Sequence, residues 1–406
     1  MVMQPGGDSP ESGRVCILKL MGTGIVIVLG GSFHFGYQIS LINPMADILQ
    51  EFLEKDLTRT HGLKLDDWAL RLVWATVAGL LFAGALLGAI CMPRLMNSIG
   101  TTRSFLISST ILCLSFALAA VSNGVGIGSI TTLQTVYLTE ISPVKYRGLM
   151  GTMTGFSTSI GFVIASGVGL PQVFGNELWH WAYILEMLPS LSCIRKGRVE
   201  MARKCLQLYQ PVHEVQLRMS EIMTDISPKN QSSYTGVTRL VRLISHSSPS
   251  RSALLICMLL NATVSFSGIL AVSFFGTFLL QAIGFSEKGA ALANCFASIS
   301  GILGNFAGSF AVDKMGRRKL ILGGLSTLVV LNVMLMALVF SFQHSTNVNY
   351  GYVFLAIFMV FFFAFSFGVG PMAWFLATEL TTSTDRSLIQ SLSVSCQYAT
   401  CFLSHL

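Results

Sequence analysis

Long, uninterrupted runs of apolar residues alternate with short polar segments along this chain of 406 residues. Most runs reach the length of about 20 residues that a helix needs to cross a bilayer. They are continuous and do not alternate as the strands of a barrel would. The pattern predicts an all-α membrane protein with eleven spans, at about 18–42, 68–91, 104–121, 124–139, 149–170, 179–193, 253–283, 289–312, 320–342, 350–377 and 387–406.

Two predicted spans, the fourth at 124–139 and the sixth at 179–193, are shorter than a bilayer is thick. The third and fourth spans are separated only by Ser122 and Asn123. Between the first two spans, the mixed charges of 45–67 predict an exposed loop.

The composition excludes several other classes of protein. Hydrophobic residues make up 52% and charged residues 11% of the chain, whereas a soluble domain carries about 25% charge. The net charge of +7 lies largely in loops between spans, so it indicates the cytoplasmic side of a membrane and not a nucleic-acid partner. The nine cysteines form no C-x-x-C pair, and no metal cluster or nucleophile–base pair is visible. We therefore expect no cofactor and no enzyme, with the lipid bilayer as a partner and the oligomeric state open; a small-solute partner is implied only by the resemblance described below.

A basic polar segment divides the chain into two halves and sets its orientation. Its surplus of Lys and Arg places it on the cytoplasmic side, and the N-terminus with it. The first apolar run is too long for a cleaved signal peptide. The sequence predicts a multi-pass protein, of the plasma membrane, divided into a cytoplasmic N-terminus (1–17), a first helical half (18–193), a cytoplasmic loop with amphipathic helices (194–251) and an incomplete second half (252–406).

Two motifs occur once in each half, at equivalent turns. In one, a polar residue is followed at three-residue intervals by Gly and then by a basic residue; in the other, Glu is followed seven residues later by Arg. The motifs are Asn97, Gly100 and Arg103 with Asp313, Gly316 and Lys319, and Glu140 and Arg147 with Glu379 and Arg386. Such a repeat indicates two parallel halves related by an axis along the membrane normal.

The repeat also exposes a difference between the halves. Glu140 lies 43 positions after Asn97, whereas Glu379 lies 66 positions after Asp313. The first half is therefore 23 residues shorter over the same two spans, and we expect a missing segment where the third span meets the fourth.

These motifs, in order and in register with the turns, resemble the sugar-porter branch of the major facilitator superfamily, and most closely the animal facilitative hexose transporters. The residues that carry the resemblance are Phe35, Gly36, Tyr37, Asn43 and Pro44; Tyr137, Glu140, Ser142, Pro143, Arg147 and Gly148; Ser267 and Gly268; Asp313, Gly316, Arg317 and Arg318; and Gly370, Pro371, Trp374, Phe375 and Glu379. The resemblance implies two six-helix halves, here with shortened fourth and sixth spans and without a twelfth. It also implies a uniporter that carries a hexose by facilitated diffusion with alternating access.

The resemblance implies a substrate site and a gate at particular positions of this sequence. The implied substrate-binding positions are Thr154, Gly155, Ser265, Ser366, Trp374 and Gln397. Where the family has amides or an acid, this chain has Gly155, Val264, Ser265, Leu270, Gly301 and Ser366. The gate is implied to be a latch of charged groups, which pair across the halves when the cytoplasmic side is closed. The latch residues are Glu140, Arg147, Asp313, Arg317, Arg318, Glu379 and Arg386.

Several alternatives remain open from the sequence. The chain could be a non-transporting member, as a truncated isoform, an incomplete gene model or a partner-binding or sensor protein, or it could carry another solute such as urate or a polyol. His34 and Gln38 in the first span fit either a permeation path or interhelical hydrogen bonds. Glu186 in the sixth span fits either a functional acid or a group near the interface.

Overall fold

The computed structural model describes residues 10–62, 66–115, 120–142, 147–176, 178–196, 248–345, 348–381 and 385–405. The secondary structure in these ranges is helical, without β-strands. Seven segments are long and apolar enough to cross a membrane: Leu20–Ile42, Gly79–Ile99, Arg147–Val168, Ser250–Ala282, Glu287–Val312, Arg317–His344 and Asn349–Leu380.

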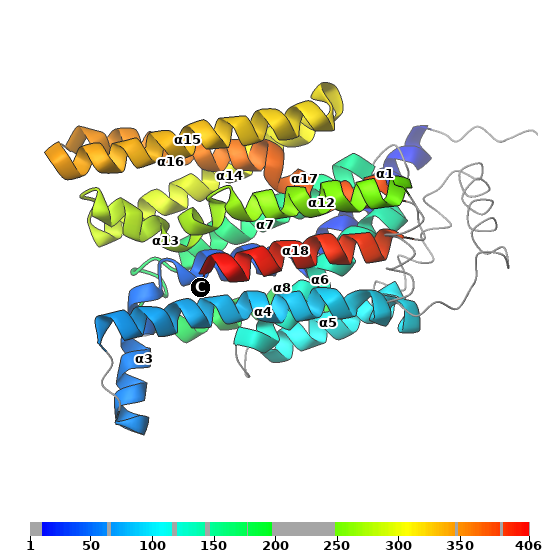
Figure 1. Cartoon of the computed structure of the whole chain (residues 1–406). Coiled ribbons are helices and arrows are strands. Elements are labelled where there is room, and N and C mark those ends of the chain that lie inside the picture. Colours follow the sequence, from blue (N-terminus) through cyan, green and yellow to red (C-terminus); the bar gives the residue numbers. More distant parts are fainter. Residues whose placement is uncertain are drawn as a thin grey trace, which may run out of the picture.

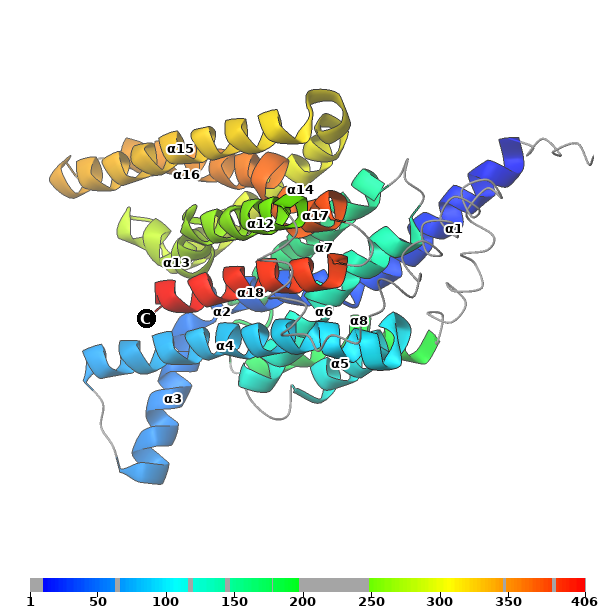
Figure 2. The same cartoon turned by 45° about the vertical axis from the view of Figure 1, so that its right-hand side comes forward.

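The helices run side by side as one bundle, in two consecutive groups (Figures 1 and 2). The first half contains α1 (Pro10–Leu29), α2 (Ser32–Ile42), α3 (Ala46–His61), α4 (Asp67–Ile99), α5 (Thr101–Ser115), α6 (Ala120–Ile141), α7 (Arg147–Val168) and α8 (Trp179–Lys196). The second half contains α12 (Ser248–Phe266), α13 (Ile269–Ala282), α14 (Glu287–Met315), α15 (Arg317–Ser345), α16 (Val348–Ala364), the π-helical turn η2 (Phe365–Val369), α17 (Gly370–Leu380) and α18 (Arg386–His405).

Within each half, neighbouring helices approach backbone to backbone at glycines. A side chain at Gly88 or Gly128 would meet main-chain atoms across the α4–α6 contact. In the second half, a side chain at Gly304 or Gly308 would meet main-chain atoms of the α16–η2 segment. Small residues permit this approach, which brings extensive van der Waals contact where lipid supplies no hydrophobic drive.

The two halves meet along several pairs of helices. α4 packs on α18, α7 packs on α14 and α17, and α2 packs on α13. One hydrophobic cluster draws residues from both sides of this boundary, among them Phe35 and Phe82 from the first half and Leu270 and Phe361 from the second. The interface between the halves therefore runs through the centre of the molecule, and the candidate site lies at this interface.

The two equivalent turns predicted by the repeat have the same backbone. Gly100 follows α4 with φ 86° and ψ 158°, and Gly316 follows α14 with φ 81° and ψ 145°. This region of backbone conformation is accessible essentially only to glycine. Each Gly lets one helix stop and the next begin at the following residue, which gives the sharp turn that both motifs require.

Three local predictions are corrected by the structure. α6 has 22 residues and spans about 33 Å, so the predicted shortening of the fourth span to 124–139 is wrong. α8 has 18 residues, one turn more than the predicted sixth span. Much of the predicted loop 45–67 is the 16-residue helix α3, which turns away from the bundle axis (Figure 1). The cytoplasmic loop predicted at 194–251 lies largely outside the described residues.

Replacing the turn glycines should destabilise the protein. Gly316→Ala and Gly100→Ala would place a Cβ in the glycine-only region, at a cost of about 1–3 kcal/mol each. Gly323→Ala serves as a matched control, because Gly323 lies within α15 and an added Cβ would meet nothing within 4 Å. The apparent Tm of the purified protein in detergent should fall for the turn variants only. Equal Tm values for Gly316→Ala and Gly323→Ala would contradict this account of the turn.

Candidate functional site

An internal cavity of about 60 Å³ lies between the two halves. At about 10–15 Å³ per water, it has room for about four to six ordered waters. Its walls come from both halves, and they are apolar over most of their area. The lining residues are Phe35, Ile39, Gly155, Thr158, Ser159, Phe162, Val264, Ile269, Leu270, Ser273, Ser298, Gly301, Asn305, Phe362, Phe365, Ser366, Gly370, Pro371, Trp374 and Gln397.

Contacts between the halves are present on both sides of this cavity. Toward the end of the bundle that carries the two repeated turns, which we call the basic end, a side chain at Gly151 would collide with Phe375. Toward the opposite end, the Thr277 amide donates a hydrogen bond to Asn43 Oδ1 at 3.2 Å. The Phe82 and Phe274 rings also meet there, 5.9 Å apart. The two halves are therefore in contact both toward the basic end and toward the opposite end of the cavity.

The first span of each half is broken beside the cavity. α1 ends and α2 begins around Gly30 and Gly31, and α12 ends and α13 begins around Ser267 and Gly268. Each break frees backbone groups, which need new partners inside a membrane. Amide side chains supply them: Gln134 Oε1 accepts from the Ser32 amide at 2.7 Å. Asn332 Nδ2 donates to the Ser267 carbonyl at 2.9 Å.

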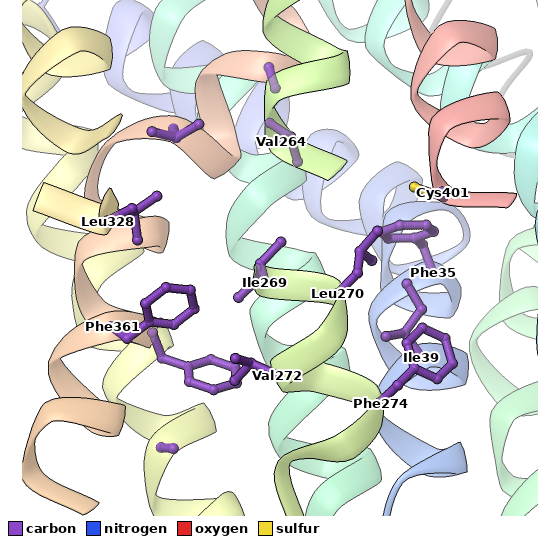
Figure 3. Packing of buried hydrophobic residues seen from close by; sticks show 14 of the residues in the cluster. Phe35, Ile39, Val264, Ile269, Leu270, Val272, Phe274, Leu328, Phe361 and Cys401 are labelled. Atoms are coloured by element: carbon purple, nitrogen blue, oxygen red, sulfur yellow. The ribbon is translucent and has the colours of Figure 1, made fainter. Parts of the chain in front are cut away.

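The two short helices that follow the breaks line the cavity. α2 contributes Phe35 and Ile39, and α13 contributes Ile269, Leu270 and Ser273. Figure 3 shows Leu270 close to Phe35 and Ile39, so that the two segments face each other across the boundary between the halves. Half-helices of this kind can tilt about their breaks without deforming the rest of the bundle.

The tenth span is also irregular at the cavity. η2 interrupts it between α16 and α17, and it places Ser366 on the cavity wall. π-helical turns inside α-helices are common at functional sites. On α17, the Trp374 ring packs edge-to-face against Phe35 at 5.2 Å. A ligand in the cavity would therefore lie against an aromatic pair that joins both halves.

The structure brings four of the six predicted substrate positions together. Gly155, Ser366, Trp374 and Gln397 all line the one cavity. Thr154 and Ser265 are buried but are not part of its wall. The Ser265 hydroxyl instead hydrogen-bonds to the Asn261 and Gln397 carbonyls, at 3.4 and 3.2 Å. These six remain predictions as binding residues.

Among the polar residues on the cavity wall that were not predicted, Asn305 is the one that carries an amide; the others are Thr158, Ser159, Ser273 and Ser298. Asn305 lies one helical turn after Gly301, where the resemblance expects an amide, and it lines the same cavity. Its Nδ2 donates to Ser159 Oγ of the first half at 2.5 Å. The signal that could have found it is the i, i+4 relation, because an amide displaced by one turn still points to the same side of a helix.

The charged groups predicted as a latch gather at the basic end. Arg317 at the start of α15 contacts Glu379 at the end of α17, with both nitrogen–oxygen distances at 3.4 Å. Arg386 Nε donates to the Thr378 carbonyl at 3.2 Å. Both contacts lie within the second half. In the first half, Arg147 Nε is buried without a hydrogen-bond partner among the residues that the structure describes.

The other predicted latch residues differ in how exposed they are. Glu140 is partly buried, and Arg318 is exposed. The Asp313 side chain lies outside the described part of the chain. Pairing of these charges across the two halves therefore remains a prediction.

A second polar cluster, away from the cavity, joins α2 to α8. Glu186 is fully buried, with one carboxylate oxygen 3.2 Å from His34 Nδ1 and the other accepting a hydrogen bond from Gln38 Nε2. Beside them, the Tyr37 hydroxyl donates to the Ala182 carbonyl at 2.7 Å. The structure thus favours interhelical hydrogen bonding for His34 and Gln38 over a permeation path, and it places Glu186 inside the bundle.

A family model described as "Sugar (and other) transporter" matches residues 23–406. The chain belongs to this family. It is 24% identical over 410 residues to solute carrier family 2, facilitated glucose transporter member 3 of Homo sapiens. That alignment covers 93% of this chain and 81% of the relative. It is 22% identical over 401 residues to a facilitated glucose transporter homolog of Caenorhabditis elegans, which covers 90% and 76%.

Solved structures confirm the fold of the family. The proton:xylose symporter XylE bound to 6-bromo-6-deoxy-D-glucose aligns with a TM-score of 0.76 at 18% identity, over 95% of this chain and 87% of that one. XylE from E. coli in a partially occluded inward-open conformation aligns with a TM-score of 0.67 at 17% identity, over 95% and 90%. The predicted major-facilitator fold and family are therefore confirmed. The named relatives are transporters and not enzymes, which agrees with the expected absence of enzymatic activity.

The buried Glu186 cluster should contribute to the stability of this family member. Glu186→Leu would leave the Gln38 amide without its acceptor inside the bundle, and breaking such a buried polar pair costs about 3 kcal/mol. Glu186→Gln keeps one acceptor oxygen and should cost less. Leu185→Ala, at a residue 37% exposed on the same helix, is the control. The apparent Tm in detergent should be lowest for Glu186→Leu, intermediate for Glu186→Gln and highest for the control Leu185→Ala. A Glu186→Leu protein as stable as the control would refute this role.

Proposed function

We propose that this chain carries a small sugar across a membrane by facilitated diffusion. The observation that supports this most directly is the cavity between the halves, whose wall carries an aromatic pair and buried polar groups that have no partner among the described residues. A sugar ring needs both an apolar face to stack on and hydrogen-bonding groups at its edge. The names of the relatives, which are glucose and xylose transporters, point to the same class of solute.

The mechanism we propose is alternating access. The contacts at the Phe375 side of the cavity and those at the Asn43 side would open in turn, while each half keeps its own packing. The broken first spans place a short movable helix from each half beside the solute. The solute would bind to the occluded form by contacts with both halves, which lowers the barrier for passing between the two open forms.

The latch would set which side opens. We place the basic end in the cytoplasm, because its turns carry the surplus of Lys and Arg. The N-terminus then lies on the same side, and the plasma membrane is the proposed location. Arg317 and Glu379 hold α15 to α17 at that end. Arg147 and Glu140 would join them across the halves when the cytoplasmic side is closed.

The non-transporting alternative is less well supported. Residues of both halves line the cavity and make the contacts around it. Examples are the hydrogen bonds between Asn305 and Ser159 and between Thr277 and Asn43. A chain retained only as a partner-binding protein would not need a solute-sized space at this boundary. Transport is therefore the activity that we propose, and the chemistry of the cavity determines which sugar is carried.

Uptake into proteoliposomes tests this function. Purified full-length chain should take up D-[¹⁴C]glucose or D-[¹⁴C]xylose saturably, above protein-free vesicles. Gly155→Leu should reduce uptake at least tenfold, because even a Cβ there would lie 2.9 Å from Asn305 Oδ1 and Pro371. Gly167→Leu on the same helix is the matched control, since an added Cβ meets nothing within 4 Å. No saturable uptake of any sugar by correctly folded protein would refute the proposal.

The latch is tested by exchanging its charges. Arg317→Glu and Glu379→Arg should each slow uptake several-fold, because like charges would then face each other at the basic end. The double variant restores opposite charges and should recover much of the rate. Lys314→Glu, an exposed change in the same turn, controls for the altered surface charge. A double variant as slow as the slower single variant would show that the pair has no specific role in gating.

A further inference from the structure

The polar groups that face the cavity without partners are mostly hydrogen-bond acceptors. Among the residues that the structure describes, no donor reaches the buried Asn305 Oδ1 on α14 or Gln397 Oε1 on α18, and the Ser273 hydroxyl on α13 has no partner. The three residues are at most 3% exposed. A buried carbonyl oxygen without a donor is unfavourable, so these atoms mark where a ligand must present donors, as sugar hydroxyls do.

A large part of the remaining wall offers a ligand no hydrogen bond. Val264, Ile269 and Leu270 lie together at the break between α12 and α13, and all three line the cavity (Figure 3). Phe362 and Phe365 extend this apolar wall along α16 and η2. A hydroxyl turned toward these side chains would leave water without gaining a partner.

The polar residues that remain on the wall are partly committed to the protein. Thr158 Oγ1 donates to the Thr154 carbonyl at 3.0 Å, and Ser298 Oγ donates to the Asn294 carbonyl at 3.0 Å. Asn305 Nδ2 is held by Ser159. The donors of these groups are used within the protein, so they offer a ligand only acceptor lone pairs. The amide oxygens of Asn305 and Gln397 add two acceptors that have no partner among the described residues, so the wall as a whole recognises a ligand that donates.

We propose that the cavity selects a deoxy sugar, that is, a pyranose with fewer hydroxyls than glucose. Its remaining hydroxyls donate to Asn305 and Gln397, its ring lies against Trp374, and its deoxygenated carbon packs on Ile269 and Leu270. This inference rests on the proposed sugar transport and specifies its substrate class. An unpaired buried hydroxyl weakens binding about tenfold or more, while an apolar pocket rejects an added hydroxyl by about a hundredfold at most. We therefore expect the best deoxy analogue to bind about tenfold to about a hundredfold more tightly than glucose.

The test measures binding and transport with one panel of sugars. D-Glucose and its 2-deoxy, 3-deoxy, 4-deoxy and 6-deoxy analogues are titrated against the purified full-length chain, with the shift in apparent Tm as the binding signal. The same sugars then compete with tracer uptake in proteoliposomes. We expect at least one deoxy analogue to act at a tenfold or more lower concentration than glucose in both assays. Glucose binding as tightly as every deoxy analogue would overturn the inference while leaving sugar transport intact.

Variants at Leu270 and Asn305 test whether the apolar wall of the cavity causes the preference for a deoxy sugar. Leu270→Asn adds a polar group to the apolar side and should reduce or reverse the preference for the deoxy analogue by improving glucose binding. Leu270→Met changes the shape but not the polarity, and it should keep the preference. Asn305→Ala removes an acceptor and should weaken glucose and deoxy analogue alike. An unchanged ratio in Leu270→Asn, in protein whose Tm shows that it folds, would refute the role of this wall; the absence of binding by every sugar would instead refute the proposed function itself.

Discussion

The constraint on which this structure depends is that a backbone polar group inside hydrocarbon must have a partner within the protein. It accounts for the helical spans, and it also decides where they can be interrupted. The first span of each half breaks only where another helix brings an amide to the freed group: Gln134 for Ser32, and Asn332 for Ser267. Because both breaks lie beside the cavity, the residues that satisfy the backbone also fix the short helices that form its wall.

The same constraint explains how much of the fold could be predicted. Long apolar runs and the repeated turns at Gly100 and Gly316 are local signals, and each has one structural solution in a bilayer. The two halves and the family followed from them. The start of α6 was mispredicted because the polar pair Ser122 and Asn123 was taken as the break between two spans, whereas both residues lie inside the helix Ala120–Ile141. A short polar pair does not end a helix whose other residues continue it. Helix α3 was missed because its mixed charges are as typical of a loop as of an exposed helix.

The candidate site was harder to predict because it depends on which helix faces touch. A resemblance assigns positions one by one, so it placed an expected amide at Gly301 and could not show that Asn305 reaches the same space from one turn away. It also could not separate Gly155, on the wall, from its neighbour Thr154, which is turned from it. The Glu186 cluster was ambiguous for the same reason: only the packing of α2 on α8 decides whether a carboxylate in a span faces lipid, water or another polar group.

The difference between contacts within and between the halves supplies a physical basis for movement. Within a half, glycines bring backbones together, as Gly36 does against Thr158, and such packing cannot shift without losing contact along a whole helix. Between the halves, apolar side chains of the shared hydrophobic cluster pack together. The polar contacts there include single hydrogen bonds of side chains, such as Thr131 with Tyr398 at 2.8 Å and Ser166 with Ser298 at 3.2 Å. A neutral bond of this kind contributes only about 1 kcal/mol, so a few can be exchanged at one end of the cavity while those at the other end hold. Rigid halves joined by weak, replaceable bonds form an assembly in which a solute contacting both halves can shift the balance between its open forms.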